Sequence, residues 1–444
     1  MPAEPMRMSL PPITTPAAGL VWLLLLLVPM AWAGPQIESW KTPGGAKVMY
    51  VHAPDLPMVD VRVVFDAGSA RDDGAPGLSR FTNALLEEGA GEWDADALAL
   101  RLEERGIELG AGSLRDMAWV SVRSLVDPAV LEVALDSLAA VLAKPRFDAD
   151  AVERVRQQML IGLRRSLQSP GTVAQRRFFQ ALYLDHPYAH PPDGEVASLQ
   201  RIDRDALAAF HDRYYVAANA VVAIVGAVGR EQAEQIADRV TAGLAAGEKA
   251  PALPPAPATA GVELRESFPS SQTHIYVGQG GISRHDPDYF PLYVGNHVLG
   301  GGSLVSLLGE EVRNKRGLSY SVYSYFSPMR VDGPFLMVAQ TKNEQAGQAL
   351  AVMRETLSDF ISKGPDADEL ERAKQNLIGG FPLRIASNAK IVEYLAMMGF
   401  YDYPLDHLDT LTTRIAAVDA EQVRDAFARR LRPDGGIAVI VGGG

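Results

Sequence analysis

Histidine can bind metals and carry protons, and one pair of histidines in this chain has a spacing that suggests such chemistry. His186 and His190 are four residues apart, which would place both rings on one face of a helix. Pro187 and Pro191 are incompatible with the helix interior that this alignment requires, and no third ligand is close in sequence. We therefore expect two loop histidines rather than a zinc site. The remaining histidines are scattered and form no ligand spacing: His52, His211, His274, His285, His297 and His407.

Other catalytic signatures are absent from the sequence. None of the 444 residues is a cysteine, so the chain has no disulfide, no thiolate ligand and no cysteine nucleophile. Neither a Gly-X-Ser-X-Gly elbow nor a Gly-X-X-X-X-Gly-Lys phosphate loop occurs, so an independent hydrolase of another mechanism finds little support. The net charge of −12 argues against nucleic acid as a partner and is compatible with a cavity that handles peptides.

The first 33 residues have the pattern of a secretory signal peptide. Arg7 precedes an apolar run over residues 19–30, and Ala31-Trp32-Ala33 offers small residues for cleavage. We expect removal after Ala33 and no membrane anchor, because Pro29 and the cleavage site argue against a helix that spans a bilayer. The expected location of the mature protein is periplasmic or secreted.

The sequence segments that would form the framework of a functional site occur twice in the chain. Residues 147–159 return as residues 365–377, at an offset of 218 residues. Asp203 and Asp419 each open a helical pattern that leads to a glycine 23 positions later, Gly226 and Gly442. Two copies of one unit are therefore present, and each is long enough to be a domain.

Strand-like and helical patterns alternate within each copy. Strands are predicted at 59–65, 119–123 and 220–225, and amphipathic helices at 95–104, 128–142 and 149–166. This order predicts an α+β fold with two homologous domains, each a mostly antiparallel sheet with helices packed on one face. Residues 247–261, rich in Pro and Ala, predict an extended linker that buries nothing. The predicted domains are 34–246 and 262–444.

Several landmarks resemble the insulinase/pitrilysin-like metallopeptidases, the inverzincins. Gly68-Ser69 followed by residues 77–89 resembles the strand and helix that carry the family's His-X-X-Glu-His signature. Later landmarks follow in the family's order: His186-Pro187-Tyr188, Tyr214-Tyr215 with Asn219, Gly300-Gly301-Gly302 and residues 313–320. The resemblance covers residues 36–443 and implies that the two domains form half of a clamshell.

By this resemblance, Arg80, Asn83 and Ala84 occupy the positions of the two zinc-binding histidines and the glutamate base. Arginine cannot be deprotonated, asparagine is a poor base and alanine has no donor atom. The family's third ligand falls at residues 160–162, where no carboxylate stands. We therefore expect a processing-peptidase-like subunit that binds no metal or cofactor and is inert alone.

The resemblance also implies a catalytic role for Arg313 and Tyr320. In active family members such a pair, seven residues apart, reaches across the closed chamber to hold substrate carbonyl oxygens and stabilise the developing oxyanion. The alternative is structural. Arg313 would lie in the last turn of a helix over 303–316, and Tyr320 would be half-buried at the start of a strand over 319–325.

Two further positions have alternative interpretations. Gly300-Gly301-Gly302 resembles the glycine-rich, substrate-handling loop of the non-catalytic mitochondrial processing peptidase subunit, or is a plain turn in which glycine supplies a positive φ. Arg80 is either a ligand for a substrate carboxylate or a solvated or acid-paired arginine on a cavity wall.

Two functions are compatible with the resemblance. In the first, this chain is the subunit without zinc in a heterodimeric periplasmic metallopeptidase, because bacterial family members divide the two motifs between paired chains. A homologous partner would carry His-X-X-Glu-His and zinc, and the substrate would be a peptide or unfolded polypeptide that adds a strand to an exposed sheet edge. In the second, the chain is a structural or peptide-binding scaffold without catalytic contribution.

Overall fold

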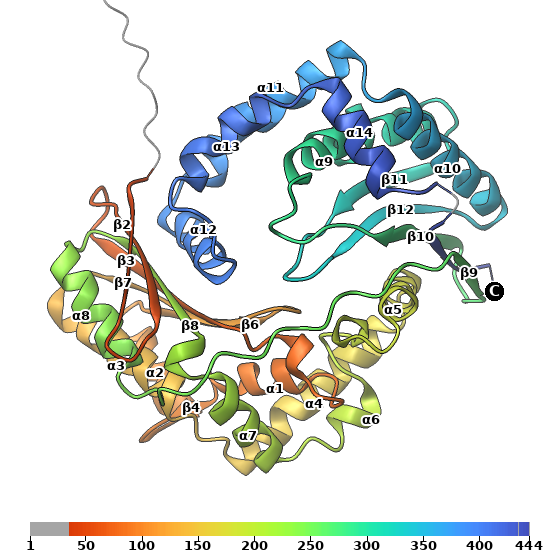
Figure 1. Ribbon diagram of the computed structural model, residues 1–444. Helices are drawn as coiled ribbons and strands as arrows, with labels where there is room; N and C mark the ends of the chain where they lie inside the picture. The colour runs from red at the N-terminus through yellow and green to blue at the C-terminus, as the bar shows by residue number, and fades with distance from the viewer. Residues whose placement is uncertain (1–34, 434, 444) are drawn as a thin grey trace, which may run out of the picture. The chain divides into compact units, whose positions relative to one another are not determined.

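Two sheets form the framework of the computed structural model, which describes residues 35–433 and 435–443 (Figure 1). The first sheet has the strand order β1-β2-β8-β3-β7-β6 and the second has the order β11-β12-β10-β13-β9. Both are mostly antiparallel, with parallel pairing of β2 with β8 and of β13 with β9. The strands are β1 (Ile37–Lys41), β2 (Lys47–His52), β3 (Met58–Phe65), β6 (Glu108–Ser113), β7 (Ala118–Leu125), β8 (Ala220–Gly226), β9 (Val262–Glu266), β10 (Gln272–Gly280), β11 (Ser319–Phe326), β12 (Pro334–Lys342) and β13 (Ile437–Val441), with a short ribbon of β4 (Gly89–Ala90) and β5 (Trp93–Asp94).

The predicted α+β class with two sheet-and-helix domains is confirmed. Strand β8 is buried at every position because both faces of the sheet are covered there, which explains its unbroken apolar sequence. The predicted signal peptide, residues 1–33, lies outside the described residues. Among residues 35–433 and 435–443, no helix combines the length and hydropathy needed to cross a bilayer.

Each sheet packs one face against helices of its own half. The first core contains side chains from every larger helix of the first half except α5 (Pro170–Tyr183), and the second core is built in the same way without α12 (Asn388–Phe400). The helices of the first half that pack on its own sheet or beside those helices are α1 (Leu78–Leu85), α2 (Ala95–Glu103), α3 (Pro128–Ala143), α4 (Ala149–Ser166), α6 (Val196–Leu199), α7 (Arg204–Tyr214) and α8 (Arg230–Thr241). Those of the second half are α9 (Tyr289–Asn296), α10 (Ala346–Lys363), α11 (Ala367–Arg384), α13 (His407–Ala416) and α14 (Ala420–Arg430).

The duplication predicted from the sequence is visible in matched helices. Helices α4 and α11 each have 18 residues and lie at the offset of the repeat. The aspartates that open the matched helices α7 and α14, Asp203 and Asp419, accept backbone N–H bonds as N-caps. The short polar side chain before each helix therefore fixes where the helix begins.

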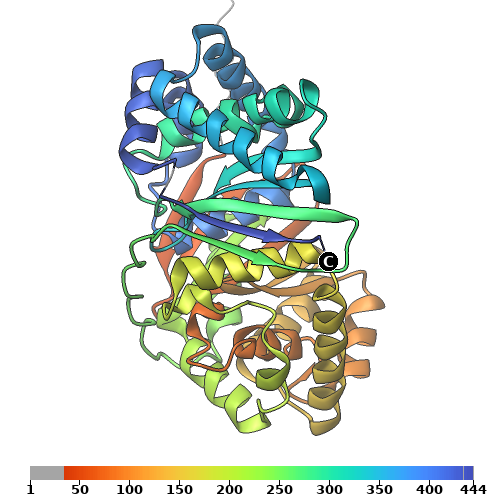
Figure 2. The ribbon, with the colours of Figure 1, turned by 90° about the vertical axis from the view of Figure 1, so that its right-hand side faces the viewer.

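One helix from each half packs on the sheet of the other half. Helix α5 (Pro170–Tyr183) lies on β10 and β13, and α12 (Asn388–Phe400) lies on β8, β3 and β2 (Figures 1 and 2). Gly399 permits the approach of α12, because a Cβ there would lie 2.4 Å from a methyl carbon of Val221. This reciprocal exchange was not predicted from the sequence, and it places residues 35–433 and 435–443 in one compact unit.

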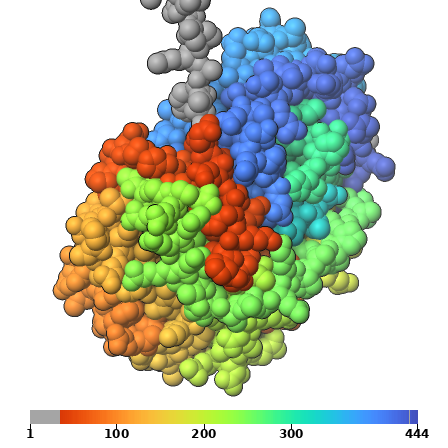
Figure 3. All heavy atoms as spheres, turned by 60° about the vertical axis from the view of Figure 1, so that its left-hand side comes forward, coloured from red at the N-terminus to blue at the C-terminus, as the bar shows by residue number. Residues whose placement is uncertain are grey.

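The space-filling view shows the first strands, in red, against the C-terminal part of the chain, in blue (Figure 3). Lys47 of β2 forms an ion pair of 2.9 Å with Asp402, which follows α12. The contact between the two halves is therefore polar at its rim and apolar beneath α12.

Residues 247–261 have no helix or strand, but the prediction that this segment buries nothing is wrong. Leu253 packs against the apolar cluster around α5. The N–H of Ala250 donates to the side chain of Asn219, and the carbonyl of Pro254 lies 2.9 Å from Nε2 of His186. The segment is extended because of its proline content, and it follows the body of the protein closely because its few apolar side chains find partners there.

Candidate functional site

Helix α1 carries the three positions compared with a zinc motif, and the structure places them in different environments. Arg80 is exposed, Asn83 is buried, and Ala84 packs against the first core. Nδ2 of Asn83 donates to the backbone oxygen of Trp119 at 3.1 Å and to the hydroxyl of Tyr215 at 3.2 Å. The residue at the position of the family's catalytic base is therefore used to attach α1 to the sheet.

The residues present do not fit a zinc ion. Helix α4 packs beside α1, and at the expected place of a third ligand it carries buried Leu160, Ile161, which is 63% exposed, and Gly162. In the part of the chain that the structure describes, no three His, Asp or Glu side chains are grouped closely enough to hold a metal ion. Leu160, Ile161 and Gly162 place no carboxylate, thiolate or imidazole beside Asn83.

His186 and His190 flank a short 3-10 turn and do not lie within a helix. The N–H of Tyr188 donates to Nδ1 of His186, and Nε2 of the same ring contacts Pro254. His190 lies just after this turn and outside any helix. Both ring nitrogens of His186 are therefore occupied by protein groups, as expected for a structural histidine.

A buried acid fixes the start of α1. The carboxylate of Asp72 accepts the N–H of Gly77 at 2.7 Å and that of Ser79 at 2.8 Å. Burial raises the pKa of Asp72 to about 8, and the two N–H donors oppose this rise. Gly77 has a φ of 96°, in the left-handed region where only glycine is unstrained, so the turn before α1 depends on it.

Edge strand β6 runs beside α1. The hydroxyls of Ser79 on α1 and Ser113 at the end of β6 are 2.7 Å apart. Because β6 pairs with β7 on one side and is the last strand of its sheet, its outer backbone groups are placed to pair with an added strand. An extended peptide added here would pass directly along α1.

Arg313 and Tyr320 lie on two connected elements of the second half. The single helix predicted over 303–316 is wrong. The segment instead contains a 3-10 turn at Ser303–Val305 and a π-helical turn, η6, at Gly309–Asn314. Arg313 is half-buried in the last turn of η6, and η6 contacts β11. The predicted strand over 319–325 is present as β11.

Tyr320 lies at a β-bulge. Ser319 and Ser321 pair with the consecutive residues Thr341 and Gln340 of β12, so Tyr320 between them has no partner. Its side chain is 81% exposed, which rules out the half-buried packing of the structural interpretation. Bulges turn a side chain away from the regular alternation of a strand, and here the bulge presents a phenol to the outside of the sheet.

The three glycines of the 300–302 segment have a packing role. Residues 297–301 form a second π-helical turn, η4 (His297–Gly301), and the positive φ of 58° belongs to Ser303 rather than to a glycine. The prediction that glycine supplies a positive φ here is therefore wrong. A Cβ on Gly300 would lie 2.6 Å from the backbone nitrogen of Ser324, so the absent side chain lets η4 lie against β11.

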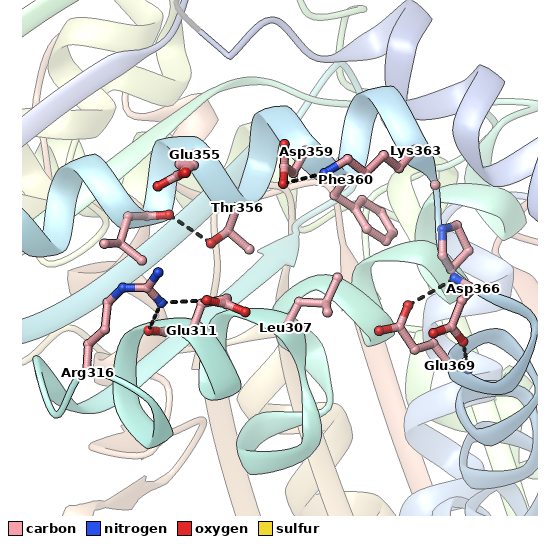
Figure 4. A pocket seen from close by; sticks show the side chains of 13 residues that line it. Leu307, Glu311, Arg316, Glu355, Thr356, Asp359, Phe360, Lys363, Asp366 and Glu369 are labelled. Carbon is pink, nitrogen blue, oxygen red and sulfur yellow. Dashed lines mark hydrogen bonds and ion pairs between the residues drawn. The ribbon is translucent and has the colours of Figure 1, made fainter.

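A cavity of about 420 Å³ lies between η6 and α10 (Figure 4). Four of its charged side chains are paired locally: Glu311 accepts from Arg316, and Asp359 accepts from Lys363 at 2.7 Å. The hydroxyl of Thr356 donates to the backbone of its own helix. These pairings indicate a solvated charged surface rather than a catalytic cluster.

Comparison with known proteins gives consistent matches. Residues 47–191 match the family described as insulinase (peptidase family M16), and residues 201–377 match the peptidase M16 inactive domain. The chain is 26% identical over 394 residues to the non-peptidase homolog YmxG of Helicobacter pylori, covering 88% of this chain and 89% of that protein. It is 27% identical over 406 residues to an uncharacterized zinc protease of Mycobacterium leprae, covering 90% of each.

A solved structure is similar over nearly the whole described chain. The crystal structure of a peptidase M16 inactive domain from Pseudomonas fluorescens has a TM-score of 0.89 and 40% sequence identity. The match covers 92% of this chain and 98% of that one.

Proposed function

The chain belongs to the insulinase (M16) peptidase family, and from that membership we propose that it is the subunit without zinc in a heterodimeric periplasmic peptidase. It is a non-catalytic member of the family by itself, since Arg80, Asn83 and Ala84 replace the zinc-binding motif. A homologous partner chain supplies His-X-X-Glu-His and the zinc ion. This chain closes the chamber and contributes Arg313 and Tyr320 to hydrolysis of a peptide bond.

The observation that carries the proposal is the contrast between two residues. Asn83, at the position of the base, is buried and bonded to the sheet, whereas Tyr320 is 81% exposed at a bulge that gives it no role in the packing of its own sheet. An exposed tyrosine held on a rigid strand costs little conformational entropy when it meets a ligand. The first half, which would need zinc, therefore has no catalytic side chain at the motif positions. The second half presents a hydrogen-bond donor, the phenol of Tyr320.

The chemistry of the two side chains fits the role. The Tyr320 phenol donates a hydrogen bond to the peptide carbonyl oxygen as that oxygen gains negative charge. The Arg313 guanidinium stays cationic at all relevant pH values and can hold an adjacent carbonyl oxygen with two N–H donors. Neither residue needs to transfer a proton completely, so both remain unchanged over a turnover.

Names of similar proteins support a role outside independent catalysis. The Helicobacter pylori relative is described as a non-peptidase homolog, and the Pseudomonas fluorescens structure as an inactive domain. The signal-peptide pattern of residues 1–33 supports export, which would place both chains in the same compartment.

A second function, that of a peptide-binding scaffold, is favoured by one observation. Edge strand β6 beside α1 can accept an added peptide strand without any contribution from Arg313 or Tyr320. In that case the chain would retain and present unfolded polypeptide, and turnover would not depend on the second half.

Reconstitution separates the two functions. The mature chain is mixed with the zinc-bearing homologue encoded nearest to it, complex formation is followed by sedimentation, and hydrolysis is followed with a quenched fluorescent unfolded peptide. We expect no turnover by this chain alone and turnover in the mixture. Arg313→Ala and Tyr320→Phe should each lower kcat by about a hundredfold, the usual effect of losing one oxyanion donor.

The matched control is Tyr293→Phe, which removes a hydroxyl whose partner is Arg384 and leaves Tyr320 in place. Full activity of both Arg313→Ala and Tyr320→Phe in a complex that still forms would refute the catalytic contribution and support the scaffold. Absence of any complex with the homologue would refute both the partnership and its chemistry.

A further inference from the structure

Two grooves occupy equivalent places in the two halves of the chain. The first, of about 210 Å³, lies between the start of α12 and strands β3, β7 and β6. The second, of about 300 Å³, lies between the start of α5 and strands β10, β12 and β11. They correspond because α5 and α12 are copies of one helix and each crosses to the opposite sheet.

The first groove is closed by ion pairs. Arg123 Nε donates to the carboxylate of Asp60, directly opposite on β3, at 3.0 Å. Arg62 reaches across to Glu393 on α12 at 3.1 Å. These ion pairs hold the long side chains across the space between helix and sheet, so this groove is smaller than the second and is lined by charged groups that already have partners.

The register shows how the second groove differs. Asp60 pairs with Arg123 in the first sheet, and the equivalent pair in the second sheet is His274 with Gln340. The next pair on the same face is Arg62 with Ser121 in the first sheet and Tyr276 with Val338 in the second. The duplication has therefore kept the groove and replaced its ion-pairing residues.

The described residues that line the second groove include no Asp, Glu, Lys or Arg. Burial lowers the pKa of His274, so its imidazole is neutral at neutral pH. The amide of Gln340 already donates to Gln272, and the hydroxyl of Thr172 and the amide of Gln175 are the groups offered for hydrogen bonds to a ligand. This lining disfavours a charged group, because no opposite charge is present to offset the loss of water.

Aromatic rings form one wall. Tyr323 on edge strand β11 is 40% exposed and stacks on Tyr325 with ring centres 6.0 Å apart. The same strand carries Tyr320, so the groove and the proposed oxyanion donor are on one rigid element. At the helix side, Gly171 keeps the groove open, since a Cβ there would lie 2.9 Å from Nδ1 of His274.

We propose that the groove between α5 and β11 binds an aromatic, uncharged side chain of the peptide, with tyrosine the best fit. The inference rests on the proposed peptide-handling function and names the residue type that the chain selects. A peptide ring stacks beside Tyr323, and its hydroxyl bonds to the amide and hydroxyl groups of Gln175 and Thr172. Peptides with a carboxylate or ammonium at that position bind more weakly, because the charge loses water without gaining a partner.

Binding to the mature chain alone tests this proposal. Fluorescein-labelled dodecapeptides of Gly and Ser that carry one central Tyr, Glu or Lys are titrated with the protein and followed by fluorescence anisotropy. We expect the Tyr peptide to bind about tenfold or more tightly than either charged peptide. Replacing the Tyr by photoreactive benzoylphenylalanine should give a crosslink to residues 169–175 or 321–323, located by mass spectrometry.

Two variants connect the selectivity to the groove. Gln175→Glu places a negative charge at its mouth, so the preference for the Tyr peptide over the Lys peptide should fall to less than about twofold. Gly171→Ala pushes His274 into the groove, so it should reduce the preference for the Tyr peptide over both charged peptides to less than about twofold. The matched control is Gln180→Glu, the same charge change on α5 away from the lining residues, which should leave the preference unchanged.

Equal affinity for the three peptides, no binding of any of them, an unchanged preference in Gln175→Glu, or a crosslink elsewhere would overturn the assignment. Failure of the proposed function is detected separately. It is measured by turnover in the two-chain mixture and by the variants of Arg313 and Tyr320, whereas the groove is measured by binding to this chain alone.

Discussion

The carboxylate of Asp116 accepts a hydrogen bond of 2.7 Å from the phenol of Tyr401, and this bond joins the two halves of the chain. Asp116 lies between β6 and β7, and Tyr401 follows α12. The same carboxylate accepts the hydroxyl of Tyr188 and, at 2.8 Å, the N–H of Arg330, and Asp116 is 3% exposed. One buried acid therefore holds the end of α12 against the first half.

Replacing Asp116 by Asn should lower the free energy of unfolding by about 1.5–3 kcal/mol, the usual value for hydrogen bonds to a charged group. The amide keeps one acceptor oxygen and turns an NH2 group towards groups that donate. Urea unfolding measures the change. The control is Asp203→Asn, at an exposed N-cap where Asn serves as well as Asp, with a shift within about 0.5 kcal/mol. Equal stability of both variants would show that the Asp116 contacts contribute nothing.

The stability of the protein should depend on pH through Asp72. Its folded-state pKa, about 8, is raised above the ordinary value of 3.8, so the folded protein retains a proton that the unfolded chain has lost. The contribution of Asp72 to the free energy of unfolding is therefore fully present below about pH 4. It falls by up to about 1.4 kcal/mol per pH unit as pH rises, and it levels off above about pH 8.

The comparison with Asp72→Asn isolates this effect, because the amide keeps an acceptor for the α1 N–H groups and does not titrate. Urea unfolding of both proteins between about pH 5 and pH 8 should show wild type losing stability relative to the variant. A difference in stability that stays constant over this range would contradict the raised pKa of Asp72.

Substituting Gly300 should show whether the glycine segment serves packing. Gly300→Ala places a Cβ against the backbone of Ser324 and should lower stability by about 1–3 kcal/mol in thermal or urea unfolding. Gly347→Ala in α10 is the control, because no atom lies within 4 Å of the added Cβ and alanine favours a helix. If Gly300→Ala kept full stability but stopped turnover in the two-chain mixture, the packing role would be refuted and a direct contact between Gly300 and the substrate would be indicated.

Metal analysis should find far less than one zinc per chain after dialysis against zinc, since residues 80, 83, 84 and 160–162 offer no suitable donors. A chelator should leave the unfolding temperature unchanged, because a ligand that does not bind the folded state cannot stabilise it. Tightly bound zinc in a one-to-one ratio, with peptide cleavage that a chelator stops, would refute the proposal that the partner chain holds the zinc and this chain does not.

Local elements were predicted well from the sequence. The helix predicted over 149–166 coincides with α4, and the strand predicted over 59–65 differs from β3 by one residue. Apolar periodicity and N-cap residues are local signals, so they are readable without the fold. The 303–316 segment was predicted wrongly as one helix, because the glycines before it pack on β11 and Ser303 adopts a positive φ.

The candidate site was only partly predictable. The exposure of Tyr320 depends on a bulge whose partner residues lie on β12, and no pattern within residues 313–320 indicates it. Asp116 was not identified at all, since a single aspartate between two strands has no sequence signature. Its importance comes from Tyr188, Tyr401 and Arg330, which are brought to it from distant parts of the chain.

The sequence by itself determined the duplication, the α+β class and the absence of zinc donors at positions 80, 83 and 84, because repeats, periodicity and side-chain chemistry are properties of the residues alone. Only the tertiary structure decided that α5 and α12 exchange sheets, that Asp116 is buried between the halves, and that His274 stands opposite Gln340 in an uncharged groove. These features depend on contacts between residues far apart in the chain, and burial and strand pairing exist only once such contacts have formed.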